Sequence, residues 1–209
     1  GEVYRVTDTA APESYVTWSP DSRTLVYSSE RDGSMSIYQY DFGTESETVL
    51  IGGDTNDTVP IYSPDGKYLM FLRDSRKLML YDVGTKQERE AARIYTDTPP
   101  LLGNSGFSWS PDSKWIAFLT NDPESRSYTN VSVVSVEGGA ARPVSFLANS
   151  FSGTIAWSPD GKYLLFDSSQ RTEPGMIARV DLSLRTPRFR EDQFRDLFRT
   201  EPRSAAAPS

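Results

Sequence analysis

The stretch Trp157-Ser158-Pro159-Asp160-Gly161-Lys162-Tyr163-Leu164-Leu165-Phe166 is the clearest copy of a unit that recurs along this 209-residue chain. Each copy holds an aromatic residue, the motif Ser-Pro-Asp, a small residue and then an apolar run. The four copies begin Trp18-Ser19-Pro20-Asp21, Tyr62-Ser63-Pro64-Asp65, Trp109-Ser110-Pro111-Asp112 and Trp157-Ser158-Pro159-Asp160. Their serines are 44, 47 and 48 residues apart. A period of roughly 40–50 residues filled with strand-like sequence is typical of β-propeller blades.

The Ser-Pro-Asp motif predicts a tight corner between two strands. Proline has no N–H to give to a strand ladder, so it belongs in the turn and not in a strand. Asp followed by Gly or Ser suits such a turn, and the Asp side chain is expected to cap it. The aromatic residue ahead of the motif is expected to pack between adjacent blades. We therefore give these residues a structural role and assign no catalytic residue to the chain.

The segments between the corners supply the remaining strands and predict an all-β propeller of four four-stranded blades. The propeller is expected over residues 1–183, with repeats at about 10–51, 54–96, 102–147 and 150–182. The fourth repeat ends with the strand-like segment Met176–Asp181, and no outer strand follows it. An outer strand is expected instead at residues 2–7, where Glu2-Val3-Tyr4-Arg5-Val6-Thr7 alternates as a strand does.

Residues 2–7 leave two architectures open. This segment could complete the fourth blade, which would join the two ends of the chain in a closed four-bladed ring. Alternatively it ends a blade outside this chain, which would then be a fragment of a six-bladed propeller. Four blades lie at the low end of the usual range of about 4–8, and the start of the sequence in mid-blade favours a fragment. A fragment would have raw strand edges, through which copies of the chain could associate.

Residues 184–209 change in character and are expected to form a connector. A short helix is predicted over residues 191–199, because Phe194, Leu197 and Phe198 form one apolar stripe at positions i, i+3 and i+4. An isolated helix of this length is marginal, so the stripe is expected to dock on the propeller or on a neighbouring domain. The Ala-, Pro- and Ser-rich end is expected to be a disordered linker.

Composition removes several classes of function. The net charge of −7 argues against nucleic-acid binding, which needs a basic surface. No apolar run approaches the roughly 18 residues of a membrane span. The chain has no Cys and no His, which excludes Ser-His-Asp triads, thiol nucleophiles and imidazole-bound or thiolate-bound metals within it. We expect no cofactor and no metal, and a periplasmic or secreted location with a cytoplasmic one left open.

Three sets of residues deserve a functional alternative to their structural interpretation. Asp54-Thr55-Asn56-Asp57-Thr58 begins like a calcium loop, with Asp65 at position twelve, but Val59 replaces the required glycine and no helix flanks it. Four loop carboxylates could converge at one ring face, although such groups are normally solvated: Glu13, Asp32, Asp122 and Glu173. Five tyrosines could line a peptide-binding funnel, although aromatic residues more often fill a core: Tyr15, Tyr38, Tyr40, Tyr81 and Tyr128.

The repeat resembles that of TolB-type, WD-like propellers over about residues 3–182. The likeness rests on Trp157–Phe166 and on Tyr27-Ser28-Ser29-Glu30-Arg31-Asp32-Gly33-Ser34 followed by Ile37-Tyr38. The entry Val3–Thr9 and the exit Phe189–Phe198 resemble bacterial tricorn-type serine peptidases. In that family a six-bladed N-terminal propeller precedes the domains that carry the peptidase centre. This chain differs in having four repeats, and it holds no position onto which a catalytic residue of that family can be transferred.

The resemblance implies a non-catalytic propeller domain that gates or docks polypeptide for a peptidase domain outside this chain. The alternative is a stand-alone TolB-like protein of the cell envelope, which recruits a protein partner through loops on one face. An enzyme with its own centre on this chain is disfavoured, because the usual acid–base and nucleophilic side chains His and Cys are absent.

Overall fold

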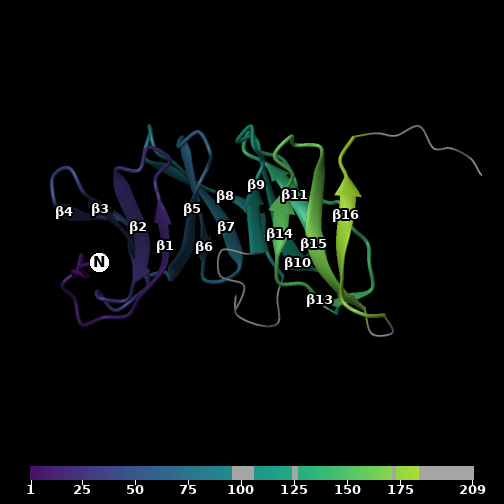
Figure 1. Cartoon of the computed structure of the whole chain (residues 1–209), viewed down its shortest axis with the longest axis horizontal. Coiled ribbons are helices and arrows are strands. Elements are labelled where there is room, and N and C mark those ends of the chain that lie inside the picture. The colour runs from purple at the N-terminus through teal and green to yellow at the C-terminus, as the bar shows by residue number, and fades with distance from the viewer. Residues whose placement is uncertain (96–105, 124–126, 171–172, 184–209) are drawn as a thin grey trace, which may run out of the picture.

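The computed structural model describes residues 1–95, 106–123, 127–170 and 173–183, and consists of four antiparallel sheets in a row (Figure 1). Blade one holds β1 (Glu13–Trp18), β2 (Thr24–Ser29), β3 (Ser36–Asp41) and β4 (Ser46–Ile51). Blade two holds β5 (Asp57–Tyr62), β6 (Tyr68–Arg73), β7 (Lys77–Asp82) and β8 (Gln87–Arg93). Blade three holds β9 (Phe107–Trp109), β10 (Trp115–Asn121), β11 (Thr129–Ser135) and β12 (Arg142–Pro143). Blade four holds β13 (Asn149–Phe151), β14 (Ile155–Trp157), β15 (Tyr163–Gln170) and β16 (Met176–Asp181). The predicted all-β fold of four four-stranded sheets is confirmed.

The second strands of blades one to three, β2, β6 and β10, are buried on both faces, whereas residues of β15 in blade four alternate between buried and partly exposed. In β6, Leu69 and Phe71 belong to the core between blades one and two, whereas Met70 and Leu72 belong to the core between blades two and three. All four side chains are at most 1% exposed. A third core fills the space between blades three and four. Burying one such side chain contributes roughly 1.5–3 kcal/mol, so the contacts between consecutive blades stabilise the row.

Blade four is built differently from the other three. Strands β13 and β14 both pair with β15, so together they replace a single inner strand, and β16 pairs with the other side of β15. The interruption is made by Asp167 of β15, whose carboxylate accepts hydrogen bonds from the amides of Gly153 at 2.9 Å and Thr154 at 2.7 Å and from the hydroxyl of Ser152 at 3.1 Å. These hydrogen bonds lie where the inner strand is interrupted, between β13 and β14, and there the chain leaves the ladder with β15. The blade is consequently three strands wide.

The expectation of an outer strand at residues 2–7 is wrong for this structure. Residues 1–12 contain no strand, and the N-terminus lies beside blade one, at the opposite end of the row from β16 (Figure 1). The closed four-bladed ring is therefore not formed, and the blades stand in an open row. The three apolar cores join blades one and two, two and three, and three and four, and within the described residues none joins blade four to blade one.

The predicted helix at 191–199, with Phe194, Leu197 and Phe198, lies outside the described residues, as does the rest of the connector. In the part of the chain that the structure describes, we find no helix with the length and apolar character needed to span a bilayer.

Candidate binding cleft

All four Ser-Pro-Asp corners have the same hydrogen bonds. The serine hydroxyl donates to the Asp carboxylate two residues later at 2.6 Å in Ser19, 2.7 Å in Ser63, 2.6 Å in Ser110 and 2.8 Å in Ser158. The same oxygen accepts the backbone N–H of the residue that begins the next strand, at 2.9–3.0 Å. The residue after the Asp has a positive φ of 58–72°. Gly66 and Gly161 accommodate this left-handed conformation, and Ser22 and Ser113 adopt it at some steric cost.

The corner carboxylates are stabilised in their charged form. The hydrogen bond from the serine hydroxyl, assisted by a backbone N–H, lowers the pKa of Asp21, Asp112 and Asp160 below its ordinary value. For Asp65, burial alone would raise the pKa, but the bonds from Ser63 and Lys67 outweigh it and lower the pKa.

These lowered pKa values predict a dependence of stability on acid. A group whose pKa is depressed in the folded state stabilises that state above its unfolded pKa, near 3.8, and loses this contribution as the pH falls through the folded value. We expect the urea midpoint of the wild-type protein to fall steeply below about pH 4. Asp112→Asn should lower the midpoint at pH 7, and its difference from wild type should shrink as the pH falls below about 4. If the two urea midpoints differed by the same amount at pH 7 and at pH 3, the stabilising role of the charged Asp112 carboxylate would be contradicted.

The aromatic residues ahead of the corners of blades two to four, Tyr62, Trp109 and Trp157, lie against the preceding blade. The Trp109 indole N–H donates to the carbonyl of Ile61 in blade two at 3.2 Å. The backbone N–H of Trp157 donates to Ser108 of blade three at 3.0 Å. Trp18 in blade one has no preceding blade in this chain and is 51% exposed, stacked on Phe42 with ring centroids 5.1 Å apart.

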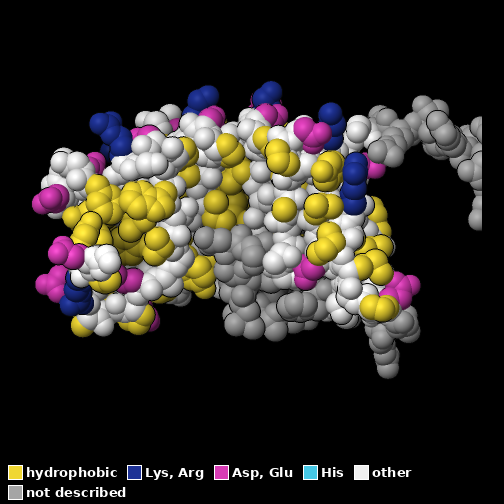
Figure 2. All heavy atoms as spheres, in the orientation of Figure 1, with side chains coloured by type: hydrophobic (Ala, Val, Ile, Leu, Met, Phe, Trp, Pro, Cys, Tyr) yellow, Lys and Arg dark blue, Asp and Glu magenta, His cyan; other side chains and the backbone are white. Residues whose placement is uncertain are grey.

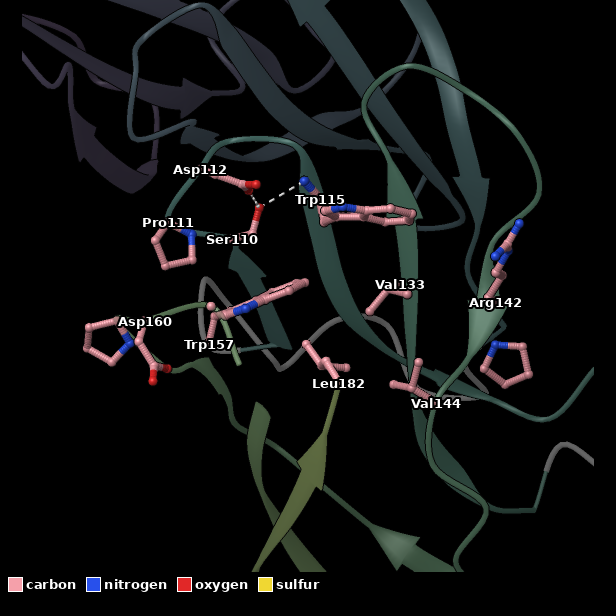
Figure 3. Close-up of a pocket in the computed structure, with 13 residues that line it drawn as sticks. Ser110, Pro111, Asp112, Trp115, Val133, Arg142, Val144, Trp157, Asp160 and Leu182 are labelled. Carbon is pink, nitrogen blue, oxygen red and sulfur yellow. Dashed lines mark hydrogen bonds between the residues drawn. The ribbon is translucent and has the colours of Figure 1, made fainter. Parts of the chain in front are cut away.

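A cleft of about 640 Å³ opens between blades three and four, beside two of the corners (Figure 3). Its walls are mainly apolar, from the blade-three residues Trp115, Val133 and Val144 and from Trp157 and Leu182 of blade four. Arg142, Asp112 and Asp160 lie at its polar edges. The indole N–H of Trp157 is buried and finds no acceptor among the described residues. The cleft therefore offers apolar surface and charges of both signs, which suits an apolar side chain attached to a peptide.

Sequence reasoning placed the motif residues Ser110, Asp112, Trp157 and Asp160 but missed the cleft they border. The missed residues Trp115, Val133, Arg142, Val144 and Leu182 carry no local motif. They meet because β11, β12 and the end of β16 come together across the blade boundary, which no spacing in the sequence reveals.

The four loop carboxylates are distributed over three blades. Glu13 pairs with Arg31 at 2.8 Å and accepts hydrogen bonds from Thr7 and Thr9. Asp32 accepts the hydroxyl of Tyr38. Asp122 and Glu173 lie after the second strands of blades three and four. Glu13 and Asp32 thus form hydrogen bonds or ion pairs at blade one. The two carboxylates are not paired with each other as a general acid and a general base.

Two residues of the calcium alternative at Asp54–Thr58 are already hydrogen-bonded within the protein. The Asp57 side chain is fully buried and accepts two hydrogen bonds from Arg73, at 2.8 and 2.9 Å. Asn56 accepts the backbone N–H of Met35 at 3.1 Å. Within the described ranges, no group of three or more acidic side chains is placed to hold a metal ion.

The tyrosines divide between core and surface. Tyr38 and Tyr81 are at most 5% exposed, and burial raises the pKa of Tyr38 to about 12, with the hydrogen bond to Asp32 adding to the effect. Tyr15 packs partly against the core of blades two and three. Tyr40 meets Phe42 edge to face at 4.9 Å, and Tyr128 is exposed. The five do not form one funnel.

Comparison with known proteins supports the fold. No family model matches the chain. It is 31% identical over 112 residues, 54% of this chain and 12% of the relative, to a protein of Sulfurisphaera tokodaii described as a tricorn-like protease C-terminal subunit. It is 29% identical over 189 residues, 87% of this chain and 40% of the relative, to the Tol-Pal system protein TolB of Francisella tularensis subsp. mediasiatica.

The crystal structure of the tricorn protease superimposes with a TM-score of 0.64 at 16% identity, covering 94% of this chain and 20% of that one. The chain spans about half or less of the length of the curated relatives it matches. The repeat, the corner geometry and these likenesses agree, and the chain is a row of propeller blades that resembles TolB and, in its fold, the tricorn protease.

Proposed function

We propose that this chain is the non-catalytic propeller part of a tricorn-like peptidase, which docks or gates polypeptide for a catalytic domain outside the chain. The observation that carries the proposal is the 31% identity over 112 residues to a tricorn-like protease subunit. The cleft between blades three and four supports it, because its apolar walls suit side chains that an unfolded polypeptide exposes and a folded one hides.

The cleft would recognise polypeptide by two contacts. An apolar side chain of the guest would lie between Trp115, Val133 and Leu182, and remove apolar surface from water. The polar backbone of the guest would lie near the charged side chains at the edge of the cleft, Arg142, Asp112 and Asp160.

We expect Leu182→Lys to weaken binding of an unfolded polypeptide, such as reduced and alkylated casein, by roughly tenfold or more, because a charge would enter the apolar cleft. The matched control is Val83→Lys. Val83 follows the third strand of blade two as Leu182 follows that of blade four, and it lies outside the cleft. Titration followed by tryptophan fluorescence measures both. Equal affinity of the two variants would remove the cleft from the proposal.

The peptidase assignment has a separate test. An antibody raised against this chain should detect, in its source, a band several times larger than 23.4 kDa. A band near the mass of the chain itself would instead favour an independent protein. This outcome does not depend on whether the cleft binds peptide.

The likeness to TolB over 87% of the chain favours one alternative, a stand-alone scaffold of the cell envelope. Its partner would be a protein bound through loops on one face, and its location would be periplasmic. Affinity capture from envelope fractions with the whole chain would then recover one defined protein, and Leu182→Lys would leave that capture unchanged.

A further inference from the structure

The cleft between blades three and four has a smaller counterpart between blades two and three. That cavity measures about 180 Å³, against about 640 Å³ for the cleft. Four lining residues of each hold the same positions in successive blades: Tyr68, Leu80, Arg89 and Val136 in the smaller cavity, and Trp115, Val133, Arg142 and Leu182 in the cleft. One joint is therefore built twice, once nearly closed and once open.

Strand register gives Arg142 the place in blade three that Arg89 has in blade two. Arg89 is paired with Leu80 of β7, and Arg142 is paired with Val133 of β11. Leu80 and Val133 each stand two residues before the partner of the residue that begins the second strand of the blade. The two arginines are thus equivalent in the fold, although no motif in the sequence links them.

Arg89 shows what an arginine at this position can reach. Its guanidinium donates to the backbone carbonyl of Val136 in the next blade, and so crosses the joint. Leu182 holds the place of Val136 in blade four, because the amides of both residues donate to the carbonyl just ahead of the second strand. Arg142 makes no corresponding bond: it is exposed, and its guanidinium has no hydrogen-bond or ion-pair partner among the described residues.

The negative charges of the cleft lie on its other side and are already hydrogen-bonded. Figure 3 shows Arg142 at one side and Asp112 and Asp160 at the other, with the apolar side chains between them. Each carboxylate accepts the serine hydroxyl of its own corner and a backbone N–H. Along the edge of the molecule that carries the corners, acidic side chains lie beside basic ones (Figure 2), as Asp160 does beside Lys162 at 3.3 Å. The charge left for a guest is that of Arg142.

We propose that the cleft selects extended segments in which an acidic side chain stands two residues from an apolar one, with Arg142 binding the carboxylate. Side chains two residues apart in an extended chain point to the same side, so the apolar one can enter the cleft while the carboxylate stays at its edge. Arg142 and Val133 are directly opposed in their ladder, and opposed side chains share one face of a sheet. The guanidinium therefore leaves its strand beside the apolar wall, where it can bind a carboxylate through two parallel N–H···O bonds.

This inference rests on the proposed function, since it names the class of polypeptide that the same cleft takes. Two unstructured peptides with blocked ends test it: both carry one Phe, and they differ only in having Glu or Gln two residues from it. Binding to the whole chain is followed by tryptophan fluorescence, because Trp115 and Trp157 line the cleft. We expect the Glu peptide to bind roughly threefold to tenfold more tightly, and the difference should shrink in high salt.

Variants of Arg142 assign the preference to its charge. Arg142→Gln should remove the preference for the Glu peptide. Arg142→Glu should reverse it, so that a third peptide with Lys at that place binds more tightly than the Glu peptide. Arg76→Gln is the matched control, because it removes the same charge from an exposed arginine between β6 and β7, outside the cleft. This control should keep the preference of the wild type.

The outcomes separate this inference from the proposed function. Equal affinity of the wild type for the Glu and Gln peptides, with Leu182→Lys still weakening both, would overturn the selectivity and leave a polypeptide site. If neither peptide bound, and Leu182→Lys and Val83→Lys also bound casein equally, both proposals would be wrong. Tighter binding of both peptides to Arg142→Gln would mean that Arg142 closes the cleft, as Arg89 crosses the smaller joint, and would overturn the inference.

Discussion

Replacing Asp57 with alanine is expected to destabilise the protein by about 3–5 kcal/mol, a large fraction of the ~5–15 kcal/mol that holds a domain folded. Asp57 is fully buried at the start of β5 and accepts two hydrogen bonds from Arg73 of β6, at 2.8 and 2.9 Å. Its loss leaves a guanidinium, 19% exposed, without its main partner. Glu88 still pairs with Arg73 at 2.8 Å, so we expect the lower half of that range.

Urea unfolding followed by tryptophan fluorescence measures this loss. Glu88→Ala is the matched control, because it removes the other carboxylate from the same arginine. Glu88 is 32% exposed, and partly solvated ion pairs contribute only about 0–1 kcal/mol. Adding Arg73→Met to Asp57→Ala should recover part of the stability by removing the unpaired charge. The assignment fails if Asp57→Ala and Glu88→Ala cost the same.

The corners were predictable from sequence because they are local. Each serine bonds to a carboxylate two residues later and to an amide five residues later, as at Ser63, Asp65 and Tyr68. Proline and a residue with positive φ fix such a turn within one short stretch. Four repeats of that stretch at near-constant spacing then predict four blades.

The ion pairs were not predictable, because they depend on strand register. Arg73 and Asp57 are 16 residues apart and meet only because they are opposed in the ladder between β5 and β6. The loop position of Glu13 allows a ring-face site, whereas in the structure Glu13 is one partner of Arg31. The sequence shows each charge but not which strand will lie beside it.

Closure of the ring was not predictable for a different reason. The strand-like alternation of residues 2–7 is real, and their distance from β1 matches that of β4 from β5. Alternation specifies which face of a strand is apolar, but it doesn't specify which edge the strand joins. In this chain the available edge, that of β16, lies at the other end of the row (Figure 1). The alternation of residues 2–7 therefore predicts a strand that this structure does not form.

The joint between blades two and three gives the second large effect that we expect. Phe118→Ala should destabilise the protein by about 3–5 kcal/mol, from lost transfer energy and the cavity left behind. Phe118 is 0% exposed and lies in the largest core, opposite Phe107 in the ladder. Phe146→Ala, at a residue 79% exposed, should change the urea midpoint little and serves as its control. Since Phe118 faces blade two, the loss should also weaken the joint itself, so hydrogen exchange should rise at β9 and β10 more than at β2 and β3. If hydrogen exchange rose equally in all four blades, the blades would unfold as one unit, and the predicted local weakening of the joint between blades two and three would be wrong.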